Sequence, residues 1–386
     1  MDILILGGGM IVHDQLLPSL YQLQRRGEAG DITVCARHES TLGALSESET
    51  IRGAFPDGCF RPVKAPYQDA LAEIRPRNVA VVALPDPLHF DAIMKALAAD
   101  QHIITVKPLV LTAAESIEIE KEARSRGLFV GIDYHKRFDD RSLMARRSYR
   151  AGQFGEFRLG TAHLMEKWFY RESNFQNWFT PESSDAFTYI GCHYVDLVHF
   201  ITGLLPASVS VYGVKDRFPN GNEGWLWTDA RVVWENGACL NVQNSLGYPD
   251  AGPGSNSQGL AMYCTGEGRG AMLRHSDQYR GLEYVYTRPG SQAGDYAEPS
   301  PDYFQYVDLG GTGLTPVGYG FRSVEALYRA AVRVEQSSDR QQMLHSIDAE
   351  GVIATPLNSR YNEQVIEAAR YSIANCGITI PCERIS

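Results

Sequence analysis

Three residues of this chain combine side-chain types and positions that suit proton transfer. Lys107 directly follows an apolar, strand-like run, His102 to Val106. A lysine can take a proton from an alcohol when burial or nearby positive charge lowers its pKa. Tyr189 and His193 are four residues apart in an apolar helical stretch, so they share one helix face. We predict that Lys107, His193 and Tyr189 are catalytic and contact the substrate; the alternatives are a surface lysine and two packing residues.

A glycine-rich turn near the start of the chain predicts a site for the pyrophosphate of a dinucleotide. Gly7 and Gly9 fit the first two positions of the fingerprint G-x-G-x-x-G, while Val12 occupies the third. Glycines between a strand and a helix let the backbone approach the phosphates at the helix N-terminus. The cofactor contacts predicted here are Gly7, Gly9, Met10 and Ile11. The alternative is a connector that binds no ligand.

The end of the second expected strand, Ile32 to Cys35, bears on the choice between NAD and NADP. An NAD site usually has an acidic residue there, which binds the ribose 2′-hydroxyl. Ala36 stands at this place and Arg37 follows it. A guanidinium suits a 2′-phosphate, so we predict that Ala36 and Arg37 contact the cofactor and that NADP is favoured. The alternative is a solvated Arg37 in an enzyme that uses NAD or both cofactors.

An aromatic segment, residues 166–179, is the predicted substrate loop. It mixes aromatic rings with amide and charged groups. Sugar faces stack on rings while amides and charges bind hydroxyl groups, which suits a small polar ligand. We predict that Trp168 and Asn177 bind the substrate; an aromatic interface patch is the alternative. Lys136 and Arg137 could also bind substrate or cofactor, or form a plain surface charge pair.

The elements that must position these residues follow two patterns. Up to about residue 130, short apolar runs alternate with helical stretches, which predicts βαβ units and a parallel sheet covered on both faces. Further on, longer extended segments and turns such as 235–237 predict a largely antiparallel sheet with few helices. We therefore expect a dinucleotide-binding Rossmann α/β domain at 1–130. An α+β domain for substrate binding and oligomerisation should follow at 131–386, with the last helices able to pack back on the first domain.

Composition narrows the class of protein. The 386 residues carry a net charge of −10, which argues against a nucleic-acid partner because such proteins need a basic face. No run of apolar residues is long enough to span a bilayer, and the first residues do not resemble a signal peptide. The seven cysteines form no C-x-x-C pair, so we expect reduced thiols in a cytoplasmic protein, no disulfide framework and no metal site.

Four motifs in order make the chain resemble the Gfo/Idh/MocA family, named after glucose-fructose oxidoreductase, inositol dehydrogenase and a rhizopine-catabolism protein. They are the glycine-rich turn, the segment 83–89 (Ala-Leu-Pro-Asp-Pro-Leu-His), the segment 106–108 (Val-Lys-Pro) and the segment 191–196 (Gly-Cys-His-Tyr-Val-Asp). The resemblance runs from residue 1 to about 215 and more loosely to the C-terminus. It implies a Rossmann domain followed by a domain with an open, mostly antiparallel sheet, which commonly forms a dimer or tetramer interface.

The resemblance also implies roles for individual residues. The family motif E-K-P reads Val106-Lys107-Pro108 here, and its lysine touches the substrate oxygen and the nicotinamide. The motif D-x-G-x-H reads from Tyr189 to His193, with tyrosine in place of aspartate. Pro85 and His89 lie in a turn that lines the cofactor site in the family. The alternative for His89 is a helix-start residue that contacts no ligand.

The resulting hypothesis is an NAD(P)-dependent dehydrogenase or reductase that acts on the CH–OH group of a sugar, sugar derivative or cyclitol. Lysine and histidine are both present, which argues against a non-catalytic, cofactor-binding regulator of the same build. A third possibility is a nicotinamide-dependent glycoside hydrolase or isomerase, which leaves the cofactor unchanged overall. We expect a homodimer or homotetramer with a carbohydrate-like substrate, and no membrane or nucleic-acid partner.

Overall fold

The computed structural model describes residues 1–266, 269–276, 284–287, 290, 294–297 and 300–382. The chain forms two compact units, Met1–Phe138 with Tyr306–Glu363, and Asp139–Gln305 with Gln364–Ser386. The sequence predicts a boundary after residue 130, with the last helices able to pack back on the first domain. In the structure the first unit runs to Phe138 and includes the later segment Tyr306–Glu363, and one division falls inside the helix α12 (Pro356–Ala374).

The first unit is built on a parallel sheet in the order β3-β2-β1-β4-β5-β6. Its strands are β1 (Ile3–Leu6), β2 (Ile32–Ala36), β3 (Arg61–Lys64), β4 (Val79–Val82), β5 (His102–Val106) and β6 (Val130–Asp133). Every residue of β1, β4 and β6 is buried, as expected for a sheet covered on both faces. The order runs outward from β1 in both directions, so the predicted Rossmann arrangement is confirmed.

Helices and short turns connect these strands. They are η1 (Val12–Leu16), α1 (Leu17–Arg25), α2 (Glu39–Ser46), α3 (Glu49–Ala54), α4 (Tyr67–Glu73), η2 (Asp86–Leu88), α5 (His89–Ala98), α6 (Ala113–Arg126) and η3 (His135–Phe138). The helix α6 shows why the sequence sets such boundaries. Thr112 accepts a hydrogen bond from the backbone N–H of Glu115 at its start, and Gly127 ends it in the left-handed conformation.

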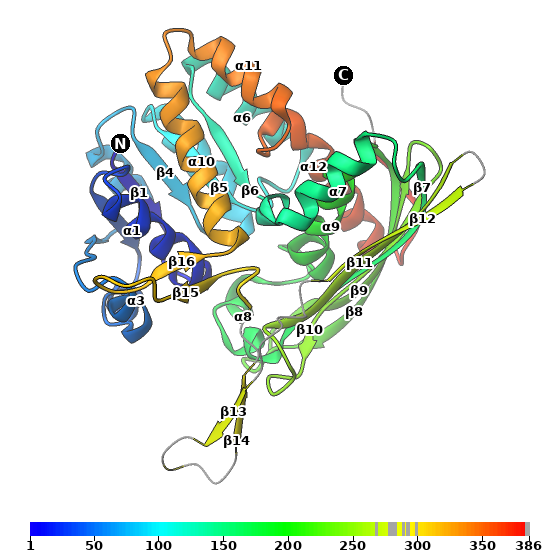
Figure 1. The fold of residues 1–386 in the computed structure, drawn as a ribbon, viewed down its shortest axis with the longest axis horizontal. Coiled ribbons are helices and arrows are strands. Elements are labelled where there is room, and N and C mark those ends of the chain that lie inside the picture. The colour runs from blue at the N-terminus through cyan, green and yellow to red at the C-terminus, as the bar shows by residue number, and fades with distance from the viewer. Residues whose placement is uncertain (267–268, 277–283, 288–289, 291–293, 298–299, 383–386) are drawn as a thin grey trace. The chain divides into compact units, whose positions relative to one another are not determined.

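A late segment of the chain completes the first unit. It contains the small sheet of β15 (Gln305–Val307) and β16 (Thr315–Val317), then α10 (Tyr319–Gln336), α11 (Arg340–Glu350) and the first turns of α12. Figure 1 shows α10 lying across β5 and β6. The approach is close, because a Cβ atom on Gly131 of β6 would come within 2.5 Å of the Leu327 side chain of α10.

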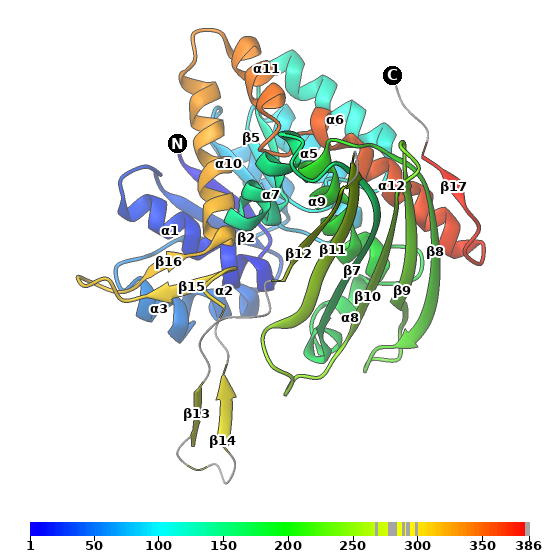
Figure 2. The ribbon, with the colours of Figure 1, turned by 45° about the vertical axis from the view of Figure 1, so that its right-hand side comes forward.

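The second unit is built on a seven-stranded sheet in the order β12-β11-β7-β10-β9-β8-β17, drawn as one curved layer in Figure 2. The strands are β7 (Glu156–Lys167), β8 (Pro206–Arg217), β9 (Glu223–Trp234), β10 (Cys239–Tyr248), β11 (Asn256–Gly266), β12 (Arg269–His275) and β17 (Ile380–Pro381). A separate hairpin consists of β13 (Tyr284–Thr287) and β14 (Gly294–Ala297). All named pairs of the large sheet are antiparallel except β7 with β10, so the expectation of a mostly antiparallel sheet is confirmed.

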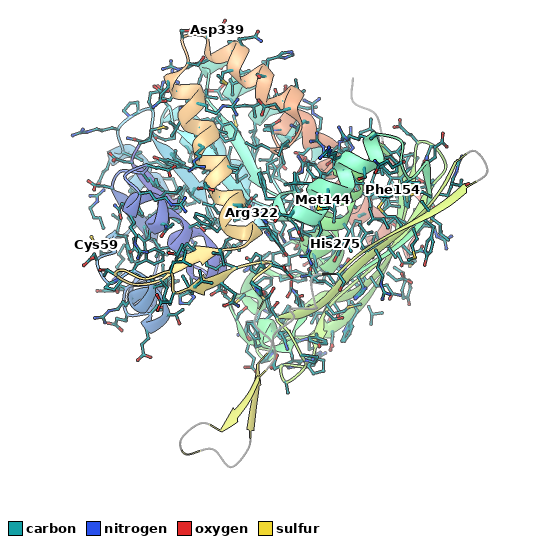
Figure 3. The ribbon with its side chains drawn as sticks, viewed as in Figure 1. Cys59, Met144, Phe154, His275, Arg322 and Asp339 are labelled. Carbon is teal, nitrogen blue, oxygen red and sulfur yellow. The ribbon has the colours of Figure 1, made fainter. Side chains whose placement is uncertain are left out.

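Helices cover one face of this sheet and leave the other open. The helical elements are α7 (Asp140–Arg150), η4 (Trp168–Glu172), α8 (Phe175–Trp178), η5 (Phe187–Gly191), α9 (Cys192–Thr202) and the last turns of α12. Asp139 caps α7 and lies 3.0 Å from Nε2 of His275, the last residue of β12, which is labelled in Figure 3. On the open face Leu159, Tyr263 and Met272 are exposed next to one another on β7, β11 and β12.

Candidate active site

The glycine turn lies where β1, β2 and β4 end. Gly7 adopts φ +110°, and a Cβ atom on it would lie 2.1 Å from the carbonyl oxygen of Ala83, so only glycine fits this position. Its N–H donates to the Cys35 carbonyl at 2.9 Å. A Cβ atom on Gly9 would meet no atom within 4 Å. The turn therefore combines a close backbone contact behind Gly7 with open space in front of Gly9, and Met10 and Ile11 beside it are half-buried.

The third fingerprint position differs from the common pattern in structure as well as in sequence. Val12 is completely buried and opens η1, a π-helical turn that runs into α1. The Gly9 carbonyl accepts hydrogen bonds from the backbone N–H groups of Val12 and His13 at 3.0 and 3.2 Å. π-Helical turns are rare and often occur at functional sites. Gln15, inside this turn, is also buried and directs its amide toward Asp133.

The end of β2 carries no carboxylate. Ala36 is the last residue of the strand and is buried, and Arg37 after it is exposed. Burial and a hydrogen bond to Asp91 raise the pKa of the Tyr67 phenol to about 12, while the positive charge of Arg37 opposes the rise. Arg37 thus stands close enough to Tyr67 to act on it electrostatically, at the same sheet edge as the glycine turn.

His89 stabilises the turn after β4 through hydrogen bonds. Pro85 opens η2 and is half-buried, whereas the imidazole of His89 is completely buried at the start of α5. Its Nδ1 lies 2.8 Å from the carbonyl oxygen of Pro108, and its Nε2 lies 2.8 Å from that of Leu84. Both ring nitrogens face backbone carbonyls, so His89 ties the turn after β4 to the segment after β5. Both hydrogen bonds of the His89 ring are thus made to the protein backbone, and its predicted contact with the cofactor stays a prediction.

Lys107 follows β5 and is half-buried. The residues after it, Pro108 to Val110, are buried, and the bond from His89 to the Pro108 carbonyl fixes the backbone there. Lys107 also acts on Asp133, because its positive charge lowers the pKa of that carboxyl group. Lys107 and the glycine turn therefore stand at the carboxyl edge of one sheet, where ligands of open α/β folds bind.

Asp133 is a candidate that the sequence reasoning missed. It ends β6 and is 2% exposed. Gln15 donates to its Oδ2 at 2.8 Å, and the hydroxyl of Ser323 in α10 donates to its Oδ1. Burial raises the pKa of Asp133 to about 6, against the opposing effects of Ser323, Gln15 and Lys107. The available signal was an acidic residue at the end of an otherwise apolar strand, Val130-Gly131-Ile132-Asp133.

Lys136 and Arg137 are not surface charges. They are 3% and 2% exposed, so the interpretation as a plain surface pair is wrong. The Lys136 ammonium lies 5.9 Å from the ring centre of Tyr319, and Arg137 donates to the Tyr361 hydroxyl at 3.2 Å. These two cations contribute to the packing between η3 and the late helices of the first unit.

In the second unit, Tyr189 and His193 lie on successive turns of η5 and α9. The π-helical turn η5 contains Tyr189, and α9 begins one residue before the buried His193. A Cβ atom on Gly191 would lie 2.6 Å from the Asn244 side-chain oxygen of β10, so glycine permits close packing on the sheet. Asp185 caps this turn by accepting from the Thr188 N–H at 2.9 Å and its hydroxyl at 2.7 Å. Burial raises the pKa of Asp185, and these two bonds oppose the rise.

Aromatic rings of the predicted substrate loop surround Tyr189. Its ring centre lies 4.8 Å from that of Phe175 and 6.1 Å from those of Trp178 and Phe179, and all three contacts are edge-to-face. Three aromatic residues of the loop therefore pack around the predicted catalytic tyrosine, and the Tyr189 side chain remains half-buried.

Trp168 and Asn177 have different neighbours. The buried guanidinium of Arg171 lies 3.8 Å from the centre of the Trp168 ring. The same guanidinium pairs with Asp216 at 2.7 Å. Trp168 itself is 43% exposed. Asn177 is exposed and shares hydrogen bonds with Asn174 and Asn220 at 3.0 and 3.4 Å. The loop thus divides into an aromatic cluster at Tyr189, a Trp168–Arg171 stack and a group of amides.

Within the described parts of the chain, no helix is both long and apolar enough to cross a membrane. Among the same residues, no group of three or more His, Cys, Asp or Glu side chains is arranged to hold a metal ion.

Comparison with protein families identifies the fold and its lineage. A family model described as "Oxidoreductase family, NAD-binding Rossmann fold" matches residues 1–134, and one described as "GFO/IDH/MocA C-terminal domain" matches residues 142–265. The chain belongs to the GFO/IDH/MocA family. The resemblance inferred from the four sequence motifs is thereby confirmed.

Individual relatives match parts of the sequence. The D-glucoside 3-dehydrogenase of Escherichia coli is 26% identical over 212 residues, 54% of this chain and 55% of its own length. The trans-1,2-dihydrobenzene-1,2-diol dehydrogenase of Macaca fascicularis is 30% identical over 42% of this chain and 44% of its own. The matches thus cover about half, or less, of these curated relatives.

Solved structures match the whole fold at low sequence identity. GenD2 from gentamicin A biosynthesis, in complex with NAD, has a TM-score of 0.69 at 17% identity and covers 99% of this chain and 96% of its own. The scyllo-inositol dehydrogenase of Lactobacillus casei has a TM-score of 0.64 at 15% identity and covers 99% of both chains. This chain departs from the family motifs at Val106 and Tyr189, and its buried aspartates include Asp133 and Asp185.

Proposed function

We propose that this chain transfers a hydride between a nicotinamide cofactor and the hydroxyl or carbonyl carbon of a sugar, sugar derivative or cyclitol. The observation that carries the proposal is the shared position of the glycine turn and Lys107 at the ends of β1 and β5, separated only by β4. The names of the relatives, a D-glucoside 3-dehydrogenase and a scyllo-inositol dehydrogenase, support the substrate class.

The residues at the sheet edge fit a dinucleotide. Gly7, Gly9, Met10 and Ile11 would hold the pyrophosphate, because the turn precedes a helical segment and leaves open space at Gly9. Ala36 and Arg37 would meet the adenine ribose, and Pro85 and Lys107 would face the nicotinamide side. The nicotinamide supplies the hydride chemistry when bound.

The chain's own residues would then handle the proton. Lys107 accepts the hydroxyl proton as the carbon–hydrogen bond breaks, and returns it when a carbonyl is reduced. In the second unit, His193 and Tyr189 would bind the substrate and take part in catalysis, and Trp168 and Asn177 would bind the substrate. The edge-to-face contacts around Tyr189 support this role because they fix the ring and leave the side chain partly accessible.

NADP is the proposed preference. The family is NAD-binding, and Arg37 with Ala36 at the end of β2 is the feature of this chain that favours the phosphorylated cofactor. An exposed guanidinium can bind a 2′-phosphate, and no carboxylate at the strand end repels it.

The open face of the large sheet is the proposed surface for a homodimer or homotetramer. Tyr263 is in register with both Leu159 and Met272, so three exposed apolar side chains form one row across three strands. Contiguous exposed apolar surface usually marks an interface. Light scattering of the wild type and Tyr263→Asp should show an oligomer that the substitution weakens. The proposal includes a cytoplasmic location, which seven free cysteines support.

A cofactor and substrate screen tests the function. NAD and NADP, each with a panel of inositols and glucosides, should raise the melting temperature, because ligands that bind the folded state stabilise it. Absorbance at 340 nm should then show net formation of reduced cofactor with the stabilising substrate. Conversion without net absorbance change would favour a hydrolase or isomerase, and no cofactor-dependent shift would contradict the proposal.

A further inference from the structure

The carboxyl end of β6 places an acid next to the segment that carries Lys107. In the pairing of β5 with β6, Val106 is in register with Asp133. Residues paired in adjacent strands project to the same side of a sheet. Asp133 therefore stands beside the position that immediately precedes Lys107 in the chain.

Two elements, η1 and α10, hold this carboxylate in one orientation. Gln15 of η1 donates to Oδ2 at 2.8 Å and also donates to the Gly320 carbonyl at 3.1 Å. Ser323 of α10 donates to Oδ1. Both carboxylate oxygens thus accept a hydrogen bond from a neutral side chain, and neither bond comes from a residue near Asp133 in sequence.

The charged groups near Asp133 point to a specific partner. Gln15 and Ser323 are neutral, and in η3 the ring of His135 stacks on Tyr319 at 5.6 Å while Lys136 lies 5.9 Å from the same ring. Lys107 is the charged side chain whose electrostatic effect on Asp133 is resolved, and this effect lowers the pKa of Asp133. Lys107 is therefore the cation within electrostatic reach of this buried carboxylate.

Burying a carboxylate is unfavourable, so its presence here needs a reason. The pKa of Asp133 rises to about 6 on burial despite two hydrogen bonds and a nearby cation. A neutral side chain at the end of an apolar strand would cost less. A buried acid that destabilises the fold and lies within electrostatic reach of a predicted catalytic lysine is more readily explained by a role in the reaction than by stability.

We propose that Asp133 is the positioning residue of Lys107, orienting its amine at the sheet edge and setting its proton affinity. The inference rests on the proposed function, in which Lys107 handles the substrate proton. Strand β6 then supplies the carboxylate of Asp133 next to Val106, the apolar residue that precedes Lys107 at the end of β5.

The first test measures the proton affinity of Lys107 without needing a substrate. The folded protein is labelled with acetic anhydride across a pH series, and mass spectrometry of the peptide carrying Lys107 gives the labelling midpoint. Asp133→Asn keeps the shape and removes the charge, so the midpoint should fall by about 0.5 to 1 pH unit, as expected for the loss of a nearby opposite charge. Asp57→Asn, an exposed acid of the same unit, should leave it unchanged.

A second variant keeps the test decisive if Asp133→Asn does not fold. Ser323→Ala removes one donor from the carboxylate and leaves its charge, so the Lys107 midpoint should rise slightly. An unchanged midpoint in the folded variants would overturn the proposal.

Kinetics with the substrate found by the screen separates this inference from the proposed function. Asp133→Asn should lower kcat by roughly tenfold with little change in KM, shift the pH profile of kcat/KM to lower pH, and have no further effect in a Lys107→Ala background. Full turnover in Lys107→Ala would refute the proposed role of Lys107. A loss in Lys107→Ala, together with equal effects of Asp133→Asn in both backgrounds, would overturn only the role of Asp133.

Discussion

The two units each bury an aspartate near a predicted catalytic residue, and they hold it in different ways. Asp185 accepts two hydrogen bonds from Thr188, three residues further along the same turn. Asp133 accepts its hydrogen bonds from Gln15 and Ser323, which are 118 and 190 residues away. The first arrangement is a local helix cap, whereas the second exists only when three distant segments have come together. The difference suggests that Asp185 serves the fold and Asp133 serves the site.

The strongest test of this comparison is the lysine next to Asp133. Lys107→Ala should lower kcat by about 10²-fold or more, because a positioned acid/base is lost, while cofactor affinity changes far less. Steady-state kinetics and cofactor titration measure both effects. Lys121→Ala, an exposed lysine of α6, is the matched control. Near-normal turnover in folded Lys107→Ala would leave Asp133 without a catalytic partner.

Burial raises the pKa of both aspartates, but the substitutions Asp133→Asn and Asp185→Ala should change the stability in opposite directions. Because the pKa of Asp133 is raised from 3.8 to about 6, the folded state binds more protons than the unfolded chain between these pH values. Stability is therefore lost as the pH rises through this window. Asp133→Asn removes this loss and should stabilise the protein at pH 7 by up to about 3 kcal/mol. Asp185→Ala loses the cap and should destabilise it by about 1 kcal/mol.

Urea unfolding at pH 4 and pH 7 measures both variants. The free energy of unfolding of Asp133→Asn, relative to that of the wild type, should increase from pH 4 to pH 7. A variant that is less stable than the wild type at pH 7 would show that Asp133 contributes to the fold, as Asp185 does, and would remove the contrast between them.

In the second unit, removal of the Tyr189 hydroxyl group tests whether this group takes part in catalysis. Tyr189→Phe keeps the ring within its aromatic cluster, so the fold should be unaffected. If the hydroxyl donates to the substrate oxygen, the loss should be about 1 to 3 kcal/mol, roughly 10- to 100-fold in kcat/KM. Tyr189→Asp, which introduces the residue of the family motif, should also lose activity if the substrate requires the aromatic ring of Tyr189. Tyr371→Phe, at an exposed position, is the control, and full activity in Tyr189→Phe would show that Lys107 and His193 suffice.

Arg37 should give the smallest effect, confined to the choice of cofactor. With the guanidinium present, NADP(H) should bind more tightly than NAD(H), and Arg37→Asp should reverse or flatten this ratio by roughly tenfold, the scale of one charge-assisted contact. Titration of both cofactors against both proteins measures it. Equal affinities in the wild type that stay equal in the variant would refute the preference.

The same contrast explains what could be predicted from the sequence. The parallel sheet and the ends of β1, β2 and β5 follow from local apolar patterning, so the positions of the glycine turn, Ala36 and Lys107 at strand ends could be inferred. Apolar patterning does not predict β3 and α11, because β3 is short and polar and α11 has few buried residues. Asp133 could not be assigned a partner, because Gln15 and Ser323 approach it only through tertiary packing. Similarly, the buried state of Lys136 and Arg137 depends on η3 meeting helices more than 180 residues later.

The return of the chain to its first unit has a consequence for folding order. The sheet strands β1 to β6 are complete by residue 133, yet α10, which packs on β6 at Gly131, begins only at Tyr319. A ribosome must therefore synthesise the segment Asp139–Gln305 of the second unit before the face of β6 can be covered. Contacts of such long sequence separation close late, since the loop entropy must be overcome first. A nascent chain that stops near residue 305 would expose apolar sheet surface, and chaperones should bind it more strongly than the full-length chain.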